Sequence, residues 1–113
     1  MRCRDARGSA TVWACCWLLL LAMLAQLVLV LTVVVARQHQ VDAAADLAAL
    51  SAAHRLQDRG PACPAARVVT EAHEATLTSC VVDGDDVSVE VTARMALPLG
   101  LSVDLRGRAR AGP

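Results

Sequence analysis

The residues of this chain that could do chemistry are three histidines, five cysteines and one acidic cluster. The histidines at positions 39, 54 and 73 are scattered, without the spacing to a second histidine or to a CxxC pair that zinc sites use. The acidic cluster, "DGDD" at 83–86, lacks the loop of about 12 residues ending in glutamate that an EF-hand needs. No nucleophile paired with a base and no phosphate-binding glycine loop occurs. The sequence therefore predicts no enzyme, no metal, no cofactor and no small-molecule substrate.

A long apolar run near the N-terminus indicates a membrane helix, and so on which side of a membrane each cysteine would lie. The run extends from Ala10 to Ala36, and its only polar side chains are Thr11, Gln26 and Thr32. A helix crossing a bilayer core needs about 20 apolar residues, whereas the apolar part of a secretory signal has only about 7 to 15. The run therefore predicts a transmembrane helix over residues 10–36, with membrane lipid as its surroundings.

The charges beside the run predict its orientation. Three arginines against one aspartate precede it, whereas only Arg37 follows it closely before Asp42 and Asp46. Because positive residues stay on the cytoplasmic side, residues 1–9 should be a cytoplasmic basic flank and residues 37–105 a small extracytoplasmic domain. We expect a single-pass protein of the cytoplasmic membrane, and exposure at the cell surface is left open.

The predicted extracytoplasmic domain is expected to need a covalent cross-link, because its hydrophobic core is small and has no aromatic residue. The chain has 113 residues, no net charge, no Phe and no Tyr, and both tryptophans, Trp13 and Trp17, lie in the apolar run. A core of this size contributes only about 3 to 5 kcal/mol. Of the five cysteines only Cys63 and Cys80 lie in the exported part; a disulfide between them would be worth about 3 kcal/mol, and the alternative is two free thiols. No basic patch with interleaved aromatics suggests nucleic-acid binding.

The remaining cysteines are Cys3 in the flank and the neighbours Cys15 and Cys16 in the apolar run. Adjacent residues on a helix point in different directions, so Cys15 and Cys16 are expected to be small apolar packing residues rather than a redox pair.

Two helices are predicted after the membrane. The first continues without a breaker to about Asp58, where Gly60 and Pro61 stop it, and its Ala-rich face from Val41 to Ala53 suits close packing under a sheet or along another helix. A short second helix should begin near Cys63, with Pro64 in its first turn. Its residues Val68, Val69 and Ala72 are expected to face one way.

A hairpin should follow the second helix. Residues 87–95 alternate apolar and polar side chains, as a half-buried strand does, and "DGDD" makes the turn. A symmetric register places Cys80 opposite Val89, on the buried face that the second helix covers. The segment "LPLGLSVDL" is a candidate third strand at an edge, and residues 106–113 are expected to form a flexible tail. The predicted fold class is α+β, with a β-hairpin or three-stranded sheet.

The order of these motifs resembles a known family. The stretches "RGSATVW" and "ARQHQVDAAADLAALSAA" look like the N-terminal anchors of TadE- and TadG-like proteins of Tad pilus systems. The later "ACPAAR", "LTSCVVDGDDVSVEV" and "ALPLG" resemble more narrowly the actinobacterial branch described as helicase/secretion-neighbourhood TadE-like proteins. The resemblance implies a non-enzymatic minor pilin or pseudopilin-like subunit, whose partners are other pilin-like or Tad-apparatus membrane subunits.

The resemblance also implies a prepilin peptidase site between Gly8 and Ser9. Precursors of this kind usually carry a glutamate five residues after the cut, where this chain has Trp13. The alternative is that Gly8 merely ends a flexible flank.

Two functions from different classes follow. The first is the structural subunit, in which Gln26 is the candidate for a hydrogen bond to a neighbouring helix; a lone tolerated glutamine is the alternative. The second is a small secreted protein with a disulfide, released by signal peptidase near Ala36.

Overall fold

The computed structural model describes the backbone of residues 3–113 and the side chains from residue 8 onward. Residues 1–2 of the predicted cytoplasmic flank lie outside the described residues. The chain divides into two units, residues 1–33 and residues 34–113. One helix, α1 (Cys3–Gln57), belongs to both, and each unit is described separately below.

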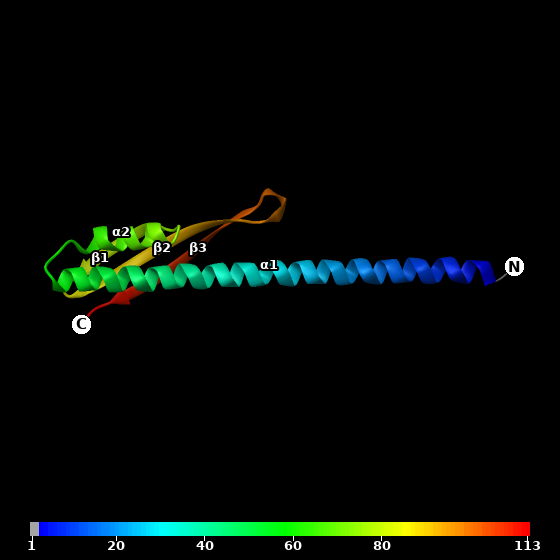
Figure 1. Cartoon of the computed structure of the whole chain (residues 1–113), viewed down its shortest axis with the longest axis horizontal. Helices are drawn as coiled ribbons and strands as arrows, with labels where there is room; N and C mark the ends of the chain where they lie inside the picture. The colour runs from blue at the N-terminus through cyan, green and yellow to red at the C-terminus, as the bar shows by residue number, and fades with distance from the viewer. Residues whose placement is uncertain (1–2) are drawn as a thin grey trace. The chain divides into compact units, whose positions relative to one another are not determined.

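The first unit is the N-terminal part of α1, shown in blue to cyan in Figure 1. Leucine and valine dominate it, and among the described residues it contains no element besides α1. The helix is long and apolar enough to cross a membrane, and its most apolar window is not buried. It begins earlier than the apolar run, since residues before Ala10 are already helical.

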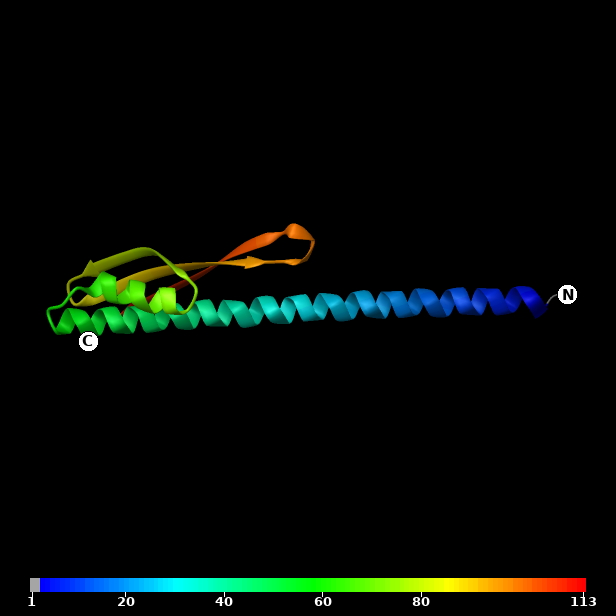
Figure 2. The ribbon, with the colours of Figure 1, turned by 45° about the horizontal axis from the view of Figure 1, so that its top comes forward.

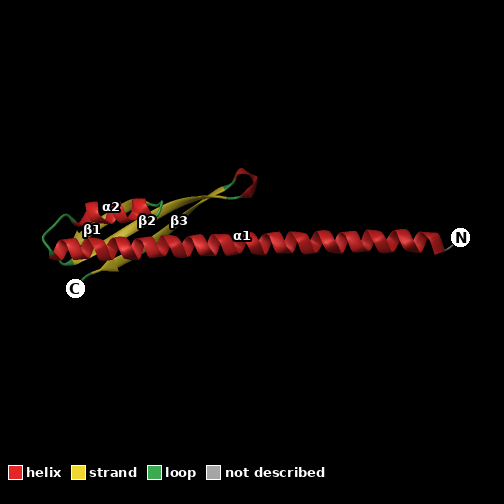
Figure 3. Cartoon of the chain, in the orientation of Figure 1, coloured by secondary structure: helices red, strands yellow, loops and turns green. Residues whose placement is uncertain are grey.

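The second unit consists of two helices and an antiparallel sheet. Figure 3 shows the helices in red and the strands in yellow. It contains the end of α1, α2 (Ala62–Ala72), β1 (Thr76–Asp83), β2 (Asp86–Ala96), the short 3-10 helix η1 (Pro98–Gly100) and β3 (Ser102–Ala111). The strands lie in the order β1-β2-β3. The fold is therefore α+β, as the sequence predicts.

The β1-β2 hairpin has the predicted register. Cys80 lies opposite Val89 and Val82 lies opposite Val87. The inward side chains of β2 alternate as expected, because successive residues of a strand face opposite sides of the sheet. Their buried members are Val87, Val89, Val91 and Ala93.

Residues 106–113 are not a flexible tail, and this prediction was wrong. They continue β3, which pairs with β2 from Ser102 opposite Ala96 to Ala111 opposite Val87. The inward positions of this segment are small, being Gly107, Ala109 and Ala111, so its apolar alternation is weak. The arginines between them point to the outer face.

The core is built largely from alanine. The Ala-rich face of α1 packs under the sheet as the sequence predicts; its buried residues are Val41, Ala44, Ala45, Ala48, Ala49, Ala52 and Ala53. Small side chains permit a close approach: a Cβ on Gly107 of β3 would lie 2.9 Å from the carbonyl oxygen of Val41. Glycine is therefore required at this crossing of helix and strand.

The buried face of α2 differs from the prediction. Ala62, Ala66 and Thr70 are buried, whereas Val68 is 68% exposed and Ala72 is exposed. The prediction for Val68 was wrong because α2 presents its smaller residues to the core. Of the predicted set, only Val69 packs partly against the core. Thr70 is tolerated there because its hydroxyl donates a hydrogen bond to the carbonyl of Arg67 at 2.9 Å.

Candidate assembly surfaces

The first candidate surface is the apolar surface of α1 in the first unit, which extends around the whole helix. Its large side chains other than Val30 are roughly half or more exposed, with Met23 at 72%. Leucine and valine would be costly to expose to water in such numbers, and they suit the hydrocarbon core of a bilayer. This surface can therefore contact lipid or the helices of other subunits.

Gln26 interrupts this apolar surface. It lies with Leu20, Met23, Leu24, Leu27 and Val30 along one shallow hollow of the helix. No hydrogen bond links its amide to another described residue. Thr32, by contrast, donates its hydroxyl to the carbonyl of Val28 at 2.7 Å, within its own helix. Gln26 thus retains donors and an acceptor that another chain could use.

The N-terminal part of the apolar helix carries an aromatic pair and two thiols. The rings of Trp13 and Trp17, four residues apart, have centroids 6.2 Å apart and are tilted by 43°. Cys15 and Cys16 are free and exposed. Gly8 and Ser9, the candidate cleavage site, are exposed positions within α1. Whether the chain is cut there stays a prediction.

A disulfide joins α2 to the sheet in the second unit. Cys63 at the start of α2 is bonded to Cys80 of β1, with 5.9 Å between their Cα atoms. Both cysteines are half-buried, and Cys80 packs against the core. The hairpin register explains this pair, because it turns Cys80 toward the face of the sheet on which α2 lies.

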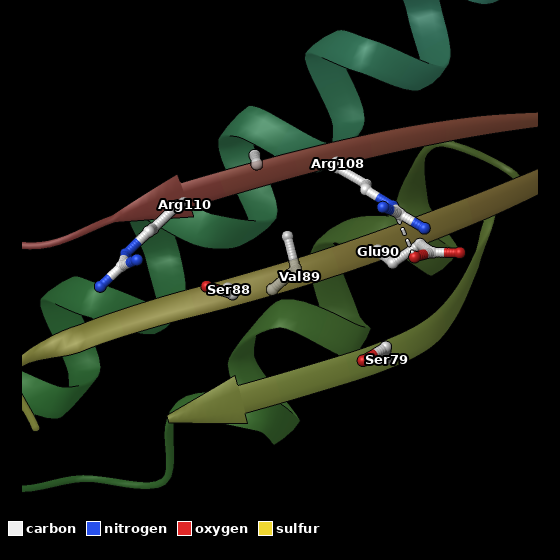
Figure 4. A pocket seen from close by; sticks show the side chains of 7 residues that line it. Ser79, Ser88, Val89, Glu90, Arg108 and Arg110 are labelled. Carbon is white, nitrogen blue, oxygen red and sulfur yellow. Dashed lines mark hydrogen bonds and ion pairs between the residues drawn. The ribbon is translucent and has the colours of Figure 1, made fainter. Parts of the chain in front are cut away.

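The outer face of the sheet is polar and held by ion pairs between strands. Glu90 accepts a hydrogen bond from Arg108 at 2.8 Å, Asp86 from Arg110 at 2.5 Å, and Asp104 from Arg94 at 3.3 Å. A groove of about 560 Å³ crosses this face, and Figure 4 shows Ser88 between Arg110 and Glu90, with Ser79 on the neighbouring strand β1. Since the groove's two arginines are already paired with carboxylates, its charges are largely balanced.

Reactive groups do not converge in this unit. Among the described residues no three His, Cys, Asp or Glu side chains form a group that could hold a metal ion. His54 lies 3.2 Å from Asp58 on the exposed end of α1, and His73 bonds to the carbonyl of Val69 at 2.9 Å.

Two apolar features escaped the sequence reasoning. Leu47 and Leu50 are 47% and 60% exposed on the side of α1 turned away from the sheet. Leu99, at the turn between β2 and β3, is 95% exposed. The sequence signal for an exposed turn at Leu99 is the uncharged stretch of residues 95–103 between Arg94 and Asp104.

These surfaces define a class of protein: an apolar helix suited to anchoring in a membrane, joined to a small α+β unit with a disulfide. Comparison with protein families gives a more particular likeness. Residues 8–57 match the family model described as "Putative Flp pilus-assembly TadE/G-like". The match covers the described length of α1 from Gly8 to its end, and α2 and the sheet lie outside it. No curated protein and no solved structure matches the chain.

Proposed function

We propose that the chain is a non-enzymatic, membrane-anchored minor pilin or pseudopilin-like subunit of a Tad-type pilus or secretion apparatus. The observation that carries the proposal is the family match over residues 8–57. It includes both the apolar segment and the Ala-rich segment packed under the sheet. The finer resemblance, to the actinobacterial TadE-like branch, rests on the motifs in residues 62–100 and is part of this proposal.

The proposed topology has residues 1–9 in the cytoplasm, residues 10–36 in the membrane and the second unit outside. The arginines before the apolar run support this orientation. The disulfide supports it as well, because such bonds persist in oxidising compartments outside the cytoplasm. The free thiols of Cys15 and Cys16 lie at the end of the helix assigned to the cytoplasmic side.

The alternative, release of a secreted domain by cleavage near Ala36, fits less well. The peptide bond after Ala36 lies inside α1, and the family match crosses it. Cleavage there would separate the apolar helix from the part of α1 that the sheet covers.

A partner contact is proposed for Gln26. A side-chain amide in lipid gains a hydrogen bond, worth about 1 kcal/mol, when a neighbouring helix supplies the partner. We therefore expect Gln26→Leu to lower recovery of partner subunits when the chain is purified in mild detergent. Leu27→Ile is the matched control, and equal recovery from both variants would refute the contact.

The intact mass of the native protein, from membrane and culture fractions with and without reductant and alkylation, tests the proposed function. A membrane chain beginning at Ser9 supports pilin-type processing, whereas a membrane chain beginning at Met1 supports an uncut anchor. A secreted fragment beginning near Arg37 would overturn the membrane-subunit proposal. Alkylation of Cys63 and Cys80 only after reduction is expected in either membrane case.

A further inference from the structure

The hairpin between β2 and β3 ends in an apolar tip, here the hairpin tip, comprising residues 95–103. No charged side chain occurs in it, and Arg94 and Asp104 pair with each other across its base at 3.3 Å. Leu99 is 95% exposed and Leu101 is 60% exposed. Leu99 also has a φ of 67°, in the left-handed region that glycine and asparagine adopt more readily than leucine. An exposed leucine thus occupies a place where folding alone would favour another residue.

The hairpin tip extends beyond the rest of the second unit. β1 pairs with β2 only as far as Thr92, whereas β2 and β3 remain paired out to Ala96 and Ser102. Figures 1 and 2 both show this orange hairpin projecting past β1 and α2. Neither of these elements therefore covers the tip.

The direction of the hairpin follows from contacts inside this unit. Gly107 lies against the carbonyl of Val41, and the side chain of Gln38 donates a hydrogen bond to the carbonyl of Arg106 at 2.8 Å. Residue numbers therefore fall in the same direction along β3 and along α1. The hairpin tip lies toward Val34, the end of this unit at which the apolar run joins it.

The hairpin reaches further from this crossing than the second unit's part of α1 does. Leu101 lies six residues beyond Gly107, a reach of about 20 Å along a strand. Ala36 lies five residues before Val41, a rise of about 7.5 Å along a helix. Within the second unit, which begins at Val34, the tip is therefore the part that extends furthest in this direction.

We propose that the hairpin tip inserts into the headgroup region of the same lipid bilayer that holds residues 10–36, with Leu99 and Leu101 as the inserted side chains. The proposal rests on the membrane anchoring proposed above. Apolar side chains seated about 5 to 10 Å into this boundary leave water without entering the hydrocarbon centre. The absence of charge in residues 95–103 suits that depth, and the ion pair between Arg94 and Asp104 stays at its outer limit. The tip gives the outer unit a second point of attachment, which restricts its tilt on the membrane.

Fluorescence quenching on the full chain in phosphatidylcholine vesicles tests this insertion. Cys3, Cys15 and Cys16 are replaced by alanine, the disulfide is kept, and the polarity-sensitive fluorophore NBD is attached at a single new cysteine. The test site is Leu99→Cys. Asp85→Cys, in the turn between β1 and β2, is the solvent control, and Leu24→Cys reports whether the apolar helix is in the bilayer. Quenchers are lipids carrying a nitroxide on the headgroup or in the acyl chain.

Insertion predicts a blue-shifted emission at position 99 that headgroup nitroxides quench, with no quenching at position 85. Water-like, unquenched emission at position 99 beside a quenched label at position 24 would overturn the insertion while leaving the anchor intact. If position 24 is also unquenched, the anchoring itself fails. A blue shift at position 99 that lipid nitroxides do not quench, and that grows with the protein-to-lipid ratio, would assign the tip to a second copy instead.

Leu99→Asn separates insertion from folding. Asparagine tolerates the left-handed backbone, so the turn should form at least as well, while the apolar side chain is lost. We expect an NBD label at Leu101→Cys to lose its quenching in the Leu99→Asn background. Unchanged quenching there would contradict the role of Leu99.

Discussion

The two parts of α1 differ in side-chain size. The part in the first unit carries large apolar side chains, whereas the face that packs under the sheet carries mostly alanine. From Leu18 to Leu31 the large apolar residues other than Val30 are 47% to 72% exposed, whereas the alanines between Val41 and Ala53 that face the sheet are almost fully buried. The difference lies in side-chain size and in the number of faces that are apolar.

This difference has a physical reason. A helix in lipid gains by presenting large apolar side chains in every direction, and its neighbours need not match it closely. A helix under a sheet must fit its partner, and alanine lets the backbones approach until Gly107 touches the carbonyl of Val41. One continuous helix can thus suit two environments, lipid and the underside of a sheet, because its side chains change from large and apolar before Ala36 to mostly alanine on the buried face after Val41.

The largest expected effect comes from placing charge on the apolar half of α1, which is proposed to lie in the membrane. The double substitution Leu21→Arg, Leu24→Arg should cost about 6 to 8 kcal/mol of insertion free energy, because each arginine near the bilayer centre is strongly disfavoured. We expect loss of the chain from the membrane fraction that resists alkaline carbonate. The same change at Leu47 and Leu50, which are exposed on the other half, should leave this fraction unchanged. Equal retention of both variants would break the comparison.

Removing the disulfide should lower the stability of the second unit, in which the sheet covers α1, and leave the apolar half of α1 unaffected. Cys63→Ala with Cys80→Ala is expected to destabilise the second unit by about 3 kcal/mol, because the link closes a loop between α2 and β1. Limited proteolysis of the full chain in detergent should release the sheet sooner than in the parent. Membrane retention should not change, since the apolar helix does not depend on the bond. Replacing Cys15 and Cys16 by alanine is the control, and faster proteolysis of that variant would contradict the assignment.

The sequence predicts α1, the β1-β2 register and the disulfide because each carries a strong local signal. The apolar run is unmistakable in length, β2 alternates clearly, and a symmetric hairpin then places Cys80 on the inner face. Of the candidate site, Gln26 could be singled out because it is the one amide in an apolar run.

The segment "LPLGLSVDL" predicts the start of β3, at an edge of the sheet, but the continuation of β3 beyond Leu105 and the reach of the hairpin tip could not be predicted because their signals depend on tertiary contacts. The inner face of "RGRARAGP" has only glycine and alanine, which by themselves are typical of loops as much as of strands. Gly107 is explained only by the approach of α1, and the reach of residues 95–103 only by the place where β1 stops pairing. Both facts join residues far apart in the chain.

The smallest expected effect tests whether side-chain size is what distinguishes the covered half. Ala48 is fully buried under the sheet, whereas Ala43 is exposed on the same helix. Ala48→Leu should destabilise the second unit by about 1 to 3 kcal/mol, since the added atoms force α1 away from the strands. Ala43→Leu should change stability by less than about 0.5 kcal/mol. Hydrogen exchange of the β2 amides, measured by mass spectrometry on the full chain in detergent, reports both. Faster exchange is expected for Ala48→Leu alone, and equal protection in the two variants would mean that alanine is not required for the packing of α1 against the sheet.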